Sequence, residues 1–267
     1  MRKTSLYALP VAFITLFLSS TPFAQERRTK PVCKRVQECL PLARAGNMKA
    51  QTDLAYIYHL PERIPTDKRK AVYWYRKAAK QGDLSSMNNL GTLLMHNDFE
   101  DIDNQDEKGL KWWQKAAKQG NMKAQANLSG LYRGDLDFEK DKEKSFKWAK
   151  KAAKQGMAIA QRDIGTMYKK GYGVQRNIEK AAKWYIKAAK QGMVRAQAVL
   201  GTLYGTGEGV NRNYIQSYAW LDIATGQGFD AAKQKLDKLK PEMTESGKRV
   251  GDKLSEKYHE KYEEPFQ

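Results

Sequence analysis

A short segment recurs along most of the chain at a nearly fixed step, and this recurrence constrains the fold more than any other feature. Its clearest copy spans residues 183–192, where a tryptophan, a tyrosine and two alanines precede a closing glycine. Successive tryptophans of the five copies are 38, 36, 36 and 36 residues apart: Trp74, Trp112, Trp148, Trp184 and Trp220. A period of 20 to 50 residues predicts a solenoid of stacked units, each too small to bury a core alone.

Each unit contains two helical patterns. The first pattern in the fourth unit carries Ala160, Ile164, Gly165 and Tyr168, whose spacing keeps them on one helical face. The small residue at the middle position lets a partner helix approach closely. In the second pattern a tryptophan and an alanine lie four residues apart before the closing glycine, which suits a left-handed helix end. We therefore expect the recurring tryptophans to pack in the core rather than to form a ligand cage.

The first 24 residues have the pattern of a secretory signal peptide. Arg2 and Lys3 precede an apolar run over residues 6–18 and a stretch of small residues that ends at Ala24. The run is shorter than the roughly 20 residues that span a bilayer, so a membrane anchor is disfavoured. The sequence thus predicts a periplasmic or secreted protein. The expected organisation is a signal peptide (1–24), a lead-in with an incomplete repeat (25–45), five repeats (46–82, 83–120, 121–156, 157–192, 193–228), and capping helices with a tail (229–267).

The formal net charge is +18, and removing residues 1–24 leaves +16. Such an excess favours anionic partners, among them acidic proteins, lipid surfaces, wall polymers and nucleic acid. Many lysines, however, recur at fixed positions of the second helices, which is also typical of a solvated face. Both interpretations stay open. These lysines are Lys77, Lys115, Lys151, Lys187, Lys80, Lys118, Lys154 and Lys190.

The chain has two cysteines, Cys33 and Cys39. An even number in an exported protein suggests a disulfide. Six residues of continuous helix would hold the two Cα atoms about 9 Å apart, beyond the usual reach of a bridge. A bridge between them therefore requires that the segment is not one straight helix; free thiols and an intermolecular bridge are the alternatives.

The turns inside the units offer no cofactor or metal motif. Glycine-rich turns at 170–174 and 206–210 join two helices without the strand, lysine and hydroxyl of a phosphate-binding loop. Counted from Asp101, an EF-hand pattern fails because Asp106 replaces the required glycine and Trp112 the required glutamate. We expect no cofactor and no dedicated metal site.

The fourth unit resembles the Sel1-like repeat, a relative of the tetratricopeptide repeat. The residues that carry the resemblance are Ala160, Ile164, Gly165, Tyr168, Gly171, Gly173, Val174, Ala181, Trp184, Tyr185, Lys187, Ala188, Ala189, Gln191 and Gly192. The resemblance implies an all-α, right-handed α-solenoid of five repeats that acts as an interaction scaffold, commonly in exported bacterial proteins. One cysteine-rich branch has members that bind β-lactams, but residues 50–230 contain no cysteine, so that activity is not carried over.

By analogy with tetratricopeptide arrays, we expect ligands on the concave face, which the first helices line. Positions 6, 10 and 13 after each opening glycine would then face inward, and their residues vary between units and are weakly basic. The expected partner-binding residues are Thr52, Tyr56, His59, Asn88, Thr92, Met95, Arg133, Arg162, Thr166, Lys169 and Thr202, beside Ala126, Gly130, Ala198 and Gly205.

The main hypothesis is a non-catalytic scaffold that binds a peptide or an acidic protein segment in this groove. One alternative is an envelope enzyme or a wall-polymer or β-lactam binder, but His59, His96 and His259 lie in no nucleophile or metal motif. A second alternative is a helical-repeat RNA binder. The export signal argues against it, as does the lack of a repeated pair of base-reading side chains. No catalytic residue is predicted.

Overall fold

The computed structural model describes residues 30–60, 67–96, 99, 104–136 and 138–262. Within these ranges the chain forms thirteen α-helices and one short 3-10 helix, which confirms the predicted all-α class. The helices are α1 (Val36–Arg44), α2 (Met48–His59), α3 (Lys68–Lys80), α4 (Leu84–His96), α5 (Gln105–Lys118), α6 (Met122–Arg133), α7 (Lys142–Lys154), α8 (Ala158–Lys170), α9 (Ile178–Ala189), α10 (Val194–Thr206), α11 (Tyr214–Gly226), α12 (Asp230–Leu239) and α13 (Glu245–Tyr262); the 3-10 helix η2 is Lys240–Glu242.

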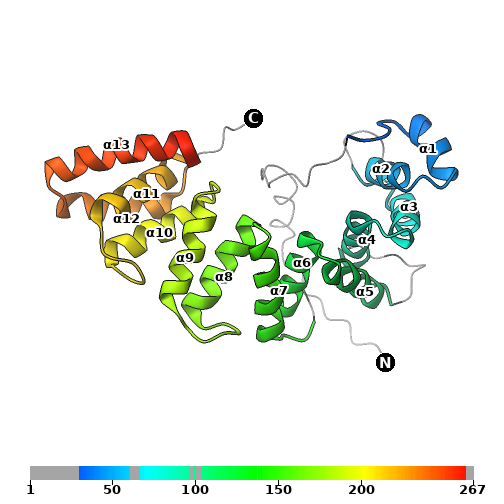
Figure 1. Ribbon diagram of the computed structural model, residues 1–267, viewed down its shortest axis with the longest axis horizontal. Coiled ribbons are helices and arrows are strands. Elements are labelled where there is room, and N and C mark those ends of the chain that lie inside the picture. The colour runs from blue at the N-terminus through cyan, green and yellow to red at the C-terminus, as the bar shows by residue number, and fades with distance from the viewer. Residues whose placement is uncertain (1–29, 61–66, 97–98, 100–103, 137, 263–267) are drawn as a thin grey trace, which may run out of the picture.

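The helices stack in sequence order into an α-solenoid that follows an open arc (Figure 1). Each unit is a helix pair, from α2 with α3 to α10 with α11, and the second helix of each pair also packs on the first helix of the next. In Figure 1, α4, α6 and α8 lie toward the inside of the arc, whereas α5 and α7 lie on its outside. The first helices therefore line the inner surface.

Local signals in each unit fix where the helices begin and end. Asn or Asp stands before most helices and accepts a hydrogen bond from the backbone N–H three residues on, as Asn47 does from Ala50 and Asn177 from Lys180. The closing glycines adopt the left-handed conformation, with φ of 104° at Gly82. There the N–H groups of Gly82 and Asp83 satisfy carbonyls of the last helical turn. The glycine thus reverses the chain into the next unit.

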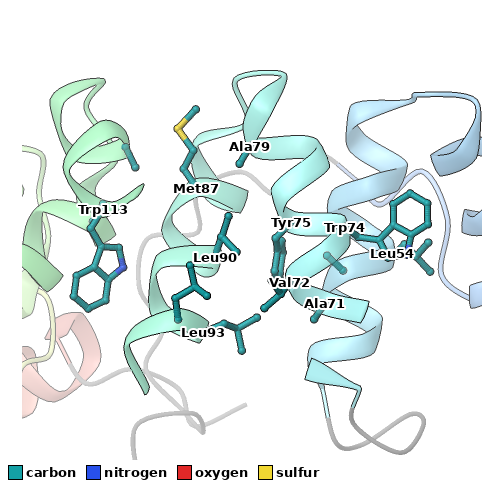
Figure 2. Packing of buried hydrophobic residues seen from close by; sticks show 14 of the residues in the cluster. Leu54, Ala71, Val72, Trp74, Tyr75, Ala79, Met87, Leu90, Leu93 and Trp113 are labelled. Atoms are coloured by element: carbon teal, nitrogen blue, oxygen red, sulfur yellow. The ribbon is translucent and has the colours of Figure 1, made fainter. Parts of the chain in front are cut away.

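Buried side chains from consecutive helices form the core (Figure 2). Leu54 and Leu90 from first helices and Tyr75 and Trp113 from second helices are at most 2% exposed. In Figure 2, Tyr75 lies between α2 and the leucines of α4, so each second helix is covered from both sides. Each unit therefore completes its core only with its neighbour, as expected of a solenoid.

The prediction for the recurring tryptophans is correct only in part. Trp74 and Trp220 are buried, but Trp112, Trp148 and Trp184 are half-buried and pack at the edge of the core. In the first four units the residue after the tryptophan lies deeper; these residues are Tyr75, Trp113, Ala149 and Tyr185. In the fifth unit Trp220 and Leu221 are equally buried, at 2% exposure each. One residue along a helix turns the side chain by about 100°. The spacing thus identifies the correct face but not the residue at its centre.

In the three units with a glycine in the middle of the first helix, that glycine packs against the residue after the tryptophan. A Cβ atom on Gly91 would lie 2.5 Å from Cδ1 of Trp113, and one on Gly165 would lie 3.0 Å from the Tyr185 ring. Gly201 faces Leu221 in the same way. The predicted close approach of paired helices is confirmed, and its partner is the residue after the tryptophan.

A ladder of glutamines links consecutive units. In four of the five units the glutamine before the closing glycine donates to the side-chain oxygen of a buried glutamine 30 residues earlier, as Gln191 does to Gln161 at 2.7 Å. In the second unit Gln119 contacts the sulfur of Met87 instead. The buried glutamine donates in turn to a carbonyl of the preceding unit, such as that of Ala153 at 3.2 Å. The other pairs are Gln81 with Gln51, Gln155 with Gln125 and Gln227 with Gln197. Each buried amide is thereby hydrogen-bonded, and the units are held in register.

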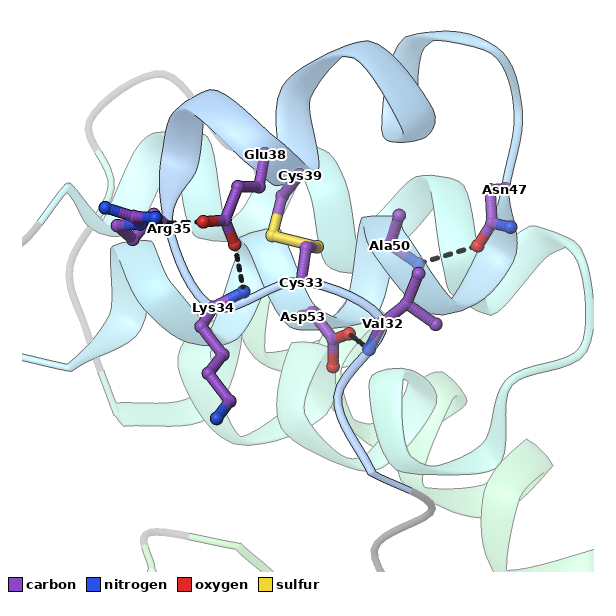
Figure 3. Close-up of a disulfide and its surroundings, with 9 residues drawn as sticks. All are labelled: Val32, Cys33, Lys34, Arg35, Glu38, Cys39, Asn47, Ala50 and Asp53. Atoms are coloured by element: carbon purple, nitrogen blue, oxygen red, sulfur yellow. Dashed lines mark hydrogen bonds and ion pairs between the residues drawn. A yellow bond between two sulfur atoms is a disulfide. The ribbon is translucent and has the colours of Figure 1, made fainter.

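A disulfide closes the N-terminal end of the described chain (Figure 3). Cys33 and Cys39 are bonded to each other with Cα atoms 5.2 Å apart. The short distance arises because α1 begins only at Val36, so Cys33 precedes the helix and lies back against it. The backbone N–H of Val32 donates to Asp53 of α2 at 2.8 Å, which ties this segment to the first complete unit.

At the other end, α12 and α13 cover the last unit, as the sequence predicts. Tyr258 and Tyr262 of α13 lie over Trp220, with ring centroids 4.4 and 5.5 Å away. Gly251 lets α13 approach Tyr218, whose hydroxyl donates to Asp252 at 2.6 Å. None of the helices in the described ranges is long and apolar enough to cross a membrane. The predicted signal peptide lies outside the described ranges, as does most of the acidic turn at 98–106, where the EF-hand pattern fails.

Candidate partner-binding surface

The residues predicted to bind a partner lie on the first helices, but they do not form one open basic groove. Most of them are half-buried: Thr52, Tyr56, His59, Thr92, Arg133, Arg162, Thr166, Lys169 and Thr202. Asn88 and Met95, in contrast, are 5% and 9% exposed, and Ala198 is 4% exposed. For these three positions the prediction of an accessible side chain is wrong.

Asn88 and Met95 are buried because α4 packs closely on its neighbours. The Asn88 carbonyl accepts a hydrogen bond from Nε1 of Trp113 at 3.1 Å, and its side-chain oxygen accepts one from Asn127 of α6 at 3.0 Å. Met95 packs against Gly109 of α5. These two residues join helices instead of facing a ligand.

The threonines on this surface are satisfied largely within the protein. Thr52, Thr92, Thr166 and Thr202 each donate a hydrogen bond to the carbonyl four residues earlier. The Thr166 hydroxyl also lies 2.9 Å from that of Tyr185. Burial is the main cause that raises the pKa of Tyr185 above its ordinary value. This tyrosine therefore stays protonated at neutral pH.

The two predicted arginines are neutralised by aspartates. Arg133 donates to Asp135 at 2.9 Å and, across the unit boundary, to Asp163 at 3.3 Å, while Arg162 donates to Asp163 at 2.9 Å. The pKa of Arg133 is raised, chiefly by its hydrogen bond to Asp135. Two guanidinium groups thus share two carboxylates, so this part of the inner surface carries no net positive charge. The prediction of a basic groove fails here.

A cationic site remains at the C-terminal end of the inner surface, between α8, α10 and α12. Nζ of Lys235 reaches from α12 to the Thr202 hydroxyl of α10 at 2.8 Å. Partial burial, followed by repulsion from Lys169 of α8, lowers the pKa of Lys235. Among the described residues neither lysine forms an ion pair. Lys169, Thr202 and Lys235, here called the inner cationic site, can therefore accept an anionic group.

Sequence reasoning missed three residues that shape this surface. Asp163 and Asn127 stand seven residues after their opening glycines, next to the predicted sixth position, so including the adjacent position would have found them. Lys235 lies beyond the last repeat, where the repeat frame gives no register. Only the folded position of α12 brings it to Thr202.

One cluster outside this surface contains the residue types of a hydrolase but not their geometry. The Ser255 hydroxyl of α13 donates to Asp222 of α11 at 2.7 Å, and Nε2 of His259 lies 3.9 Å from the same carboxylate. Nucleophilic catalysis requires a base that takes the proton of the hydroxyl, with the imidazole between serine and carboxylate. Here the carboxylate lies between them, and the contacts fasten α13 to α11.

The other two histidines lie near the ends of first helices, where His59 is half-buried and His96 is exposed. Burial is the main cause that lowers the pKa of His59 and that of His96. Their rings contact Tyr75 and Trp113 respectively. Within the described residues no group of three or more His, Cys, Asp or Glu side chains is arranged to hold a metal ion.

Five Sel1 repeats match the chain, at residues 49–83, 84–121, 123–157, 158–193 and 194–229. The chain belongs to the Sel1 repeat family. Sel1 repeat proteins generally act as protein-interaction scaffolds and are typically non-catalytic. The comparison thus confirms the resemblance inferred from the sequence.

Two solved structures are similar to this chain. One is c5321 of uropathogenic Escherichia coli, described as a protective antigen with an SLR fold: 33% identity, TM-score 0.73, 85% of this chain and 48% of that chain covered. The other is a Sel1 repeat protein of Oxalobacter formigenes: 31% identity, TM-score 0.70, 76% of this chain and 59% of that chain covered. The chain thus spans about half to three-fifths of their lengths. A search of curated proteins finds no match.

Proposed function

We propose that this protein is a non-catalytic scaffold of the bacterial periplasm or secreted fraction that binds an acidic segment of a partner protein on its inner surface. The observation that carries the proposal is the inner cationic site. There, Lys235 donates to the Thr202 hydroxyl and is repelled by Lys169, and neither lysine has a carboxylate partner among the described residues. A carboxylate placed between them would relieve their repulsion and gain charge-assisted hydrogen bonds.

The remainder of the inner surface supports the same role without adding net charge. Its residues differ between units, whereas the core and ladder residues recur, so partner selectivity can arise there without disturbing the stack. The Arg133–Asp163 and Asn127–Asn88 contacts hold adjacent first helices together. A partner therefore meets a surface that is largely formed before binding, which lowers the entropic cost of association.

Charge reversal at the inner cationic site tests the proposal. The full chain would be immobilised as wild type, as the double variant Lys169→Glu with Lys235→Glu, and as the control Lys170→Glu with Lys238→Glu, whose lysines are exposed outside the site. Proteins captured from envelope extract would be quantified by mass spectrometry. We expect the wild type and the control to enrich the same proteins and the double variant to lose them.

Capture that is undiminished in the double variant would remove the inner surface from the proposal. Turnover of peptidoglycan fragments or β-lactams by the pure protein would overturn the non-catalytic assignment.

A further inference from the structure

The second helices α3, α5, α7 and α9 carry lysine at the same four positions. Counted from the recurring tryptophan of each helix, these positions are −4, −1, +3 and +6, and only Tyr73 departs from lysine. We call this set the lysine grid: Lys70, Lys77, Lys80; Lys108, Lys111, Lys115, Lys118; Lys144, Lys147, Lys151, Lys154; Lys180, Lys183, Lys187 and Lys190. All fifteen side chains are exposed.

The grid forms a continuous cationic face. Steps of three, four and three residues keep its members on one side of each helix over about 15 Å. The helices that bear it include α5 and α7 on the outside of the arc, opposite the inner surface (Figure 1). Within the described residues only three grid lysines form an ion pair: Lys70 with Asp67, Lys111 with Glu107 and Lys144 with Asp141. All three acids lie at or near helix N-termini, so the rest of the face is uncompensated.

Aromatic rings hold several of these ammonium groups in place. Nζ of Lys115, Lys151 and Lys187 lies 5.3, 4.4 and 4.5 Å from the ring centroid of the tryptophan three residues earlier. Three of the four lysines at position −4 lie in the same way over tyrosines of the first helix: Lys70 over Tyr58 at 5.3 Å, Lys144 over Tyr132 at 5.4 Å and Lys180 over Tyr168 at 5.8 Å. These cation–π contacts order the charges and cover the rings. These lysine side chains are already partly ordered, so less conformational entropy is lost when an anion binds to them.

A purely solvated face does not account for the grid. Like charges three and four residues apart on a helix destabilise it, and solubility is served as well by mixed charges. The grid also ends at α11, the second helix that α13 covers. In α11 the matching positions hold Gln216, Ala219, Ile223 and Gly226, and Tyr258 and Tyr262 of α13 cover Trp220.

We propose that the lysine grid binds a flexible, carboxylated polysaccharide that follows the outside of the arc. The charge and the curvature together select this partner. A flat bilayer can touch only part of a convex face, and the one strongly exposed large apolar side chain on these four helices is Tyr73, at 52%, too little for insertion. Duplex nucleic acid would have to bend around the arc at a cost in deformation energy that a flexible chain does not incur.

The covered rings argue against single-stranded nucleic acid, whose binding depends on bases that stack on open aromatic faces. Lysine ammonium groups act as hydrated point charges without the fixed geometry of arginine. They suit repeated anionic groups on an adaptable chain. The outer face would thus bind a polymer independently of the inner surface, which we assign to protein.

The test measures binding of the pure full chain to polygalacturonate at several salt concentrations. The grid variant replaces Lys115, Lys118, Lys151 and Lys154 by glutamine. The control variant makes the same change at Lys123, Lys170, Lys238 and Lys253, which are exposed outside the grid. We expect the grid variant to bind about tenfold more weakly at low salt with a smaller salt dependence, and the control to stay within about twofold of wild type.

Equal weakening in both variants would overturn the proposal, because net charge alone would then explain binding. Tighter binding to vesicles of anionic phospholipid, or to a single-stranded oligonucleotide at equal charge, would overturn the choice of partner. A second measurement needs no variant. Bound polygalacturonate should protect the grid lysines of the wild type from acetylation but not Lys238 or Lys253, and uniform protection would contradict the assignment.

Discussion

Replacing Gly91 by alanine tests whether the second, fourth and fifth units close by packing the residue after the tryptophan against a glycine of the first helix. The added Cβ would lie 2.5 Å from Cδ1 and 2.8 Å from Nε1 of Trp113, and 3.0 Å from the backbone oxygen of Gly109. The indole cannot yield easily, because it is 2% exposed and its Nε1 donates to Asn88 at 3.1 Å.

The magnitude follows from two opposing effects. Alanine in a helix interior gains about 1 kcal/mol over glycine. Overpacking of a filled core costs about 1 to 3 kcal/mol, and two rigid neighbours favour the upper end of this range. We therefore expect Gly91→Ala to lower the free energy of unfolding by about 1 to 2 kcal/mol.

The matched control is Gly247→Ala in α13, where the nearest atom to the new Cβ is the Thr244 hydroxyl at 3.2 Å. There the helix preference should prevail, with a gain of up to about 1 kcal/mol. Urea unfolding followed by far-ultraviolet circular dichroism measures both variants. A Gly91→Ala variant at least as stable as wild type, with an unchanged dependence on urea, would refute the packing argument.

Three further predictions concern the N-terminal disulfide, a glycine turn and the half-buried His59. Reducing the Cys33–Cys39 disulfide should loosen only the N-terminal segment, by about 2 kcal/mol for so short a loop, and limited proteolysis should then cleave before α2. Gly173→Ala places a Cβ 2.0 Å from the Lys142 carbonyl oxygen at a φ of 66°, so it should lose more stability in thermal unfolding than Gly228→Ala, which has φ of 79° and open space. The pKa of His59 is lower in the folded than in the unfolded protein, so as the pH falls the unfolded chain is protonated first. The free energy of unfolding should therefore keep its full His59 contribution above about pH 6.5 and decrease at lower pH. His59→Gln should make that decrease smaller in unfolding measured as a function of pH.

The sequence was most informative where a residue acts within its own unit. The helix pairs, the small residue of each first helix and the left-handed closing glycine depend on spacings of a few residues. How deeply each tryptophan is buried was harder to predict, because it depends on how the second helix is rotated against its neighbours. In α9 this rotation leaves Trp184 near the surface, where Lys187 lies over its ring.

Contacts between units escaped the sequence for a different reason. Pairing of Arg133 with Asp163 joins residues 30 positions apart, and the distance from Lys235 to Thr202 depends on where α12 docks. The repeat frame predicts which helix bears each side chain. It does not predict which charges of neighbouring units neutralise each other. Because Arg133 and Arg162 are paired with aspartates, Lys169 is the only one of the three predicted cationic residues without an ion pair among the described residues.

A photo-reactive residue placed at Lys169 would show whether a protein binds on the inner surface. It would be introduced into the otherwise unchanged chain, into the Lys235→Glu background, and separately at Lys151 on the outer face, and irradiated in the native cell. We expect a discrete protein adduct from position 169, a weaker adduct in the Lys235→Glu background, and no such adduct from position 151. A protein adduct that forms at 151 and not at 169 would rule out protein binding at the inner cationic site.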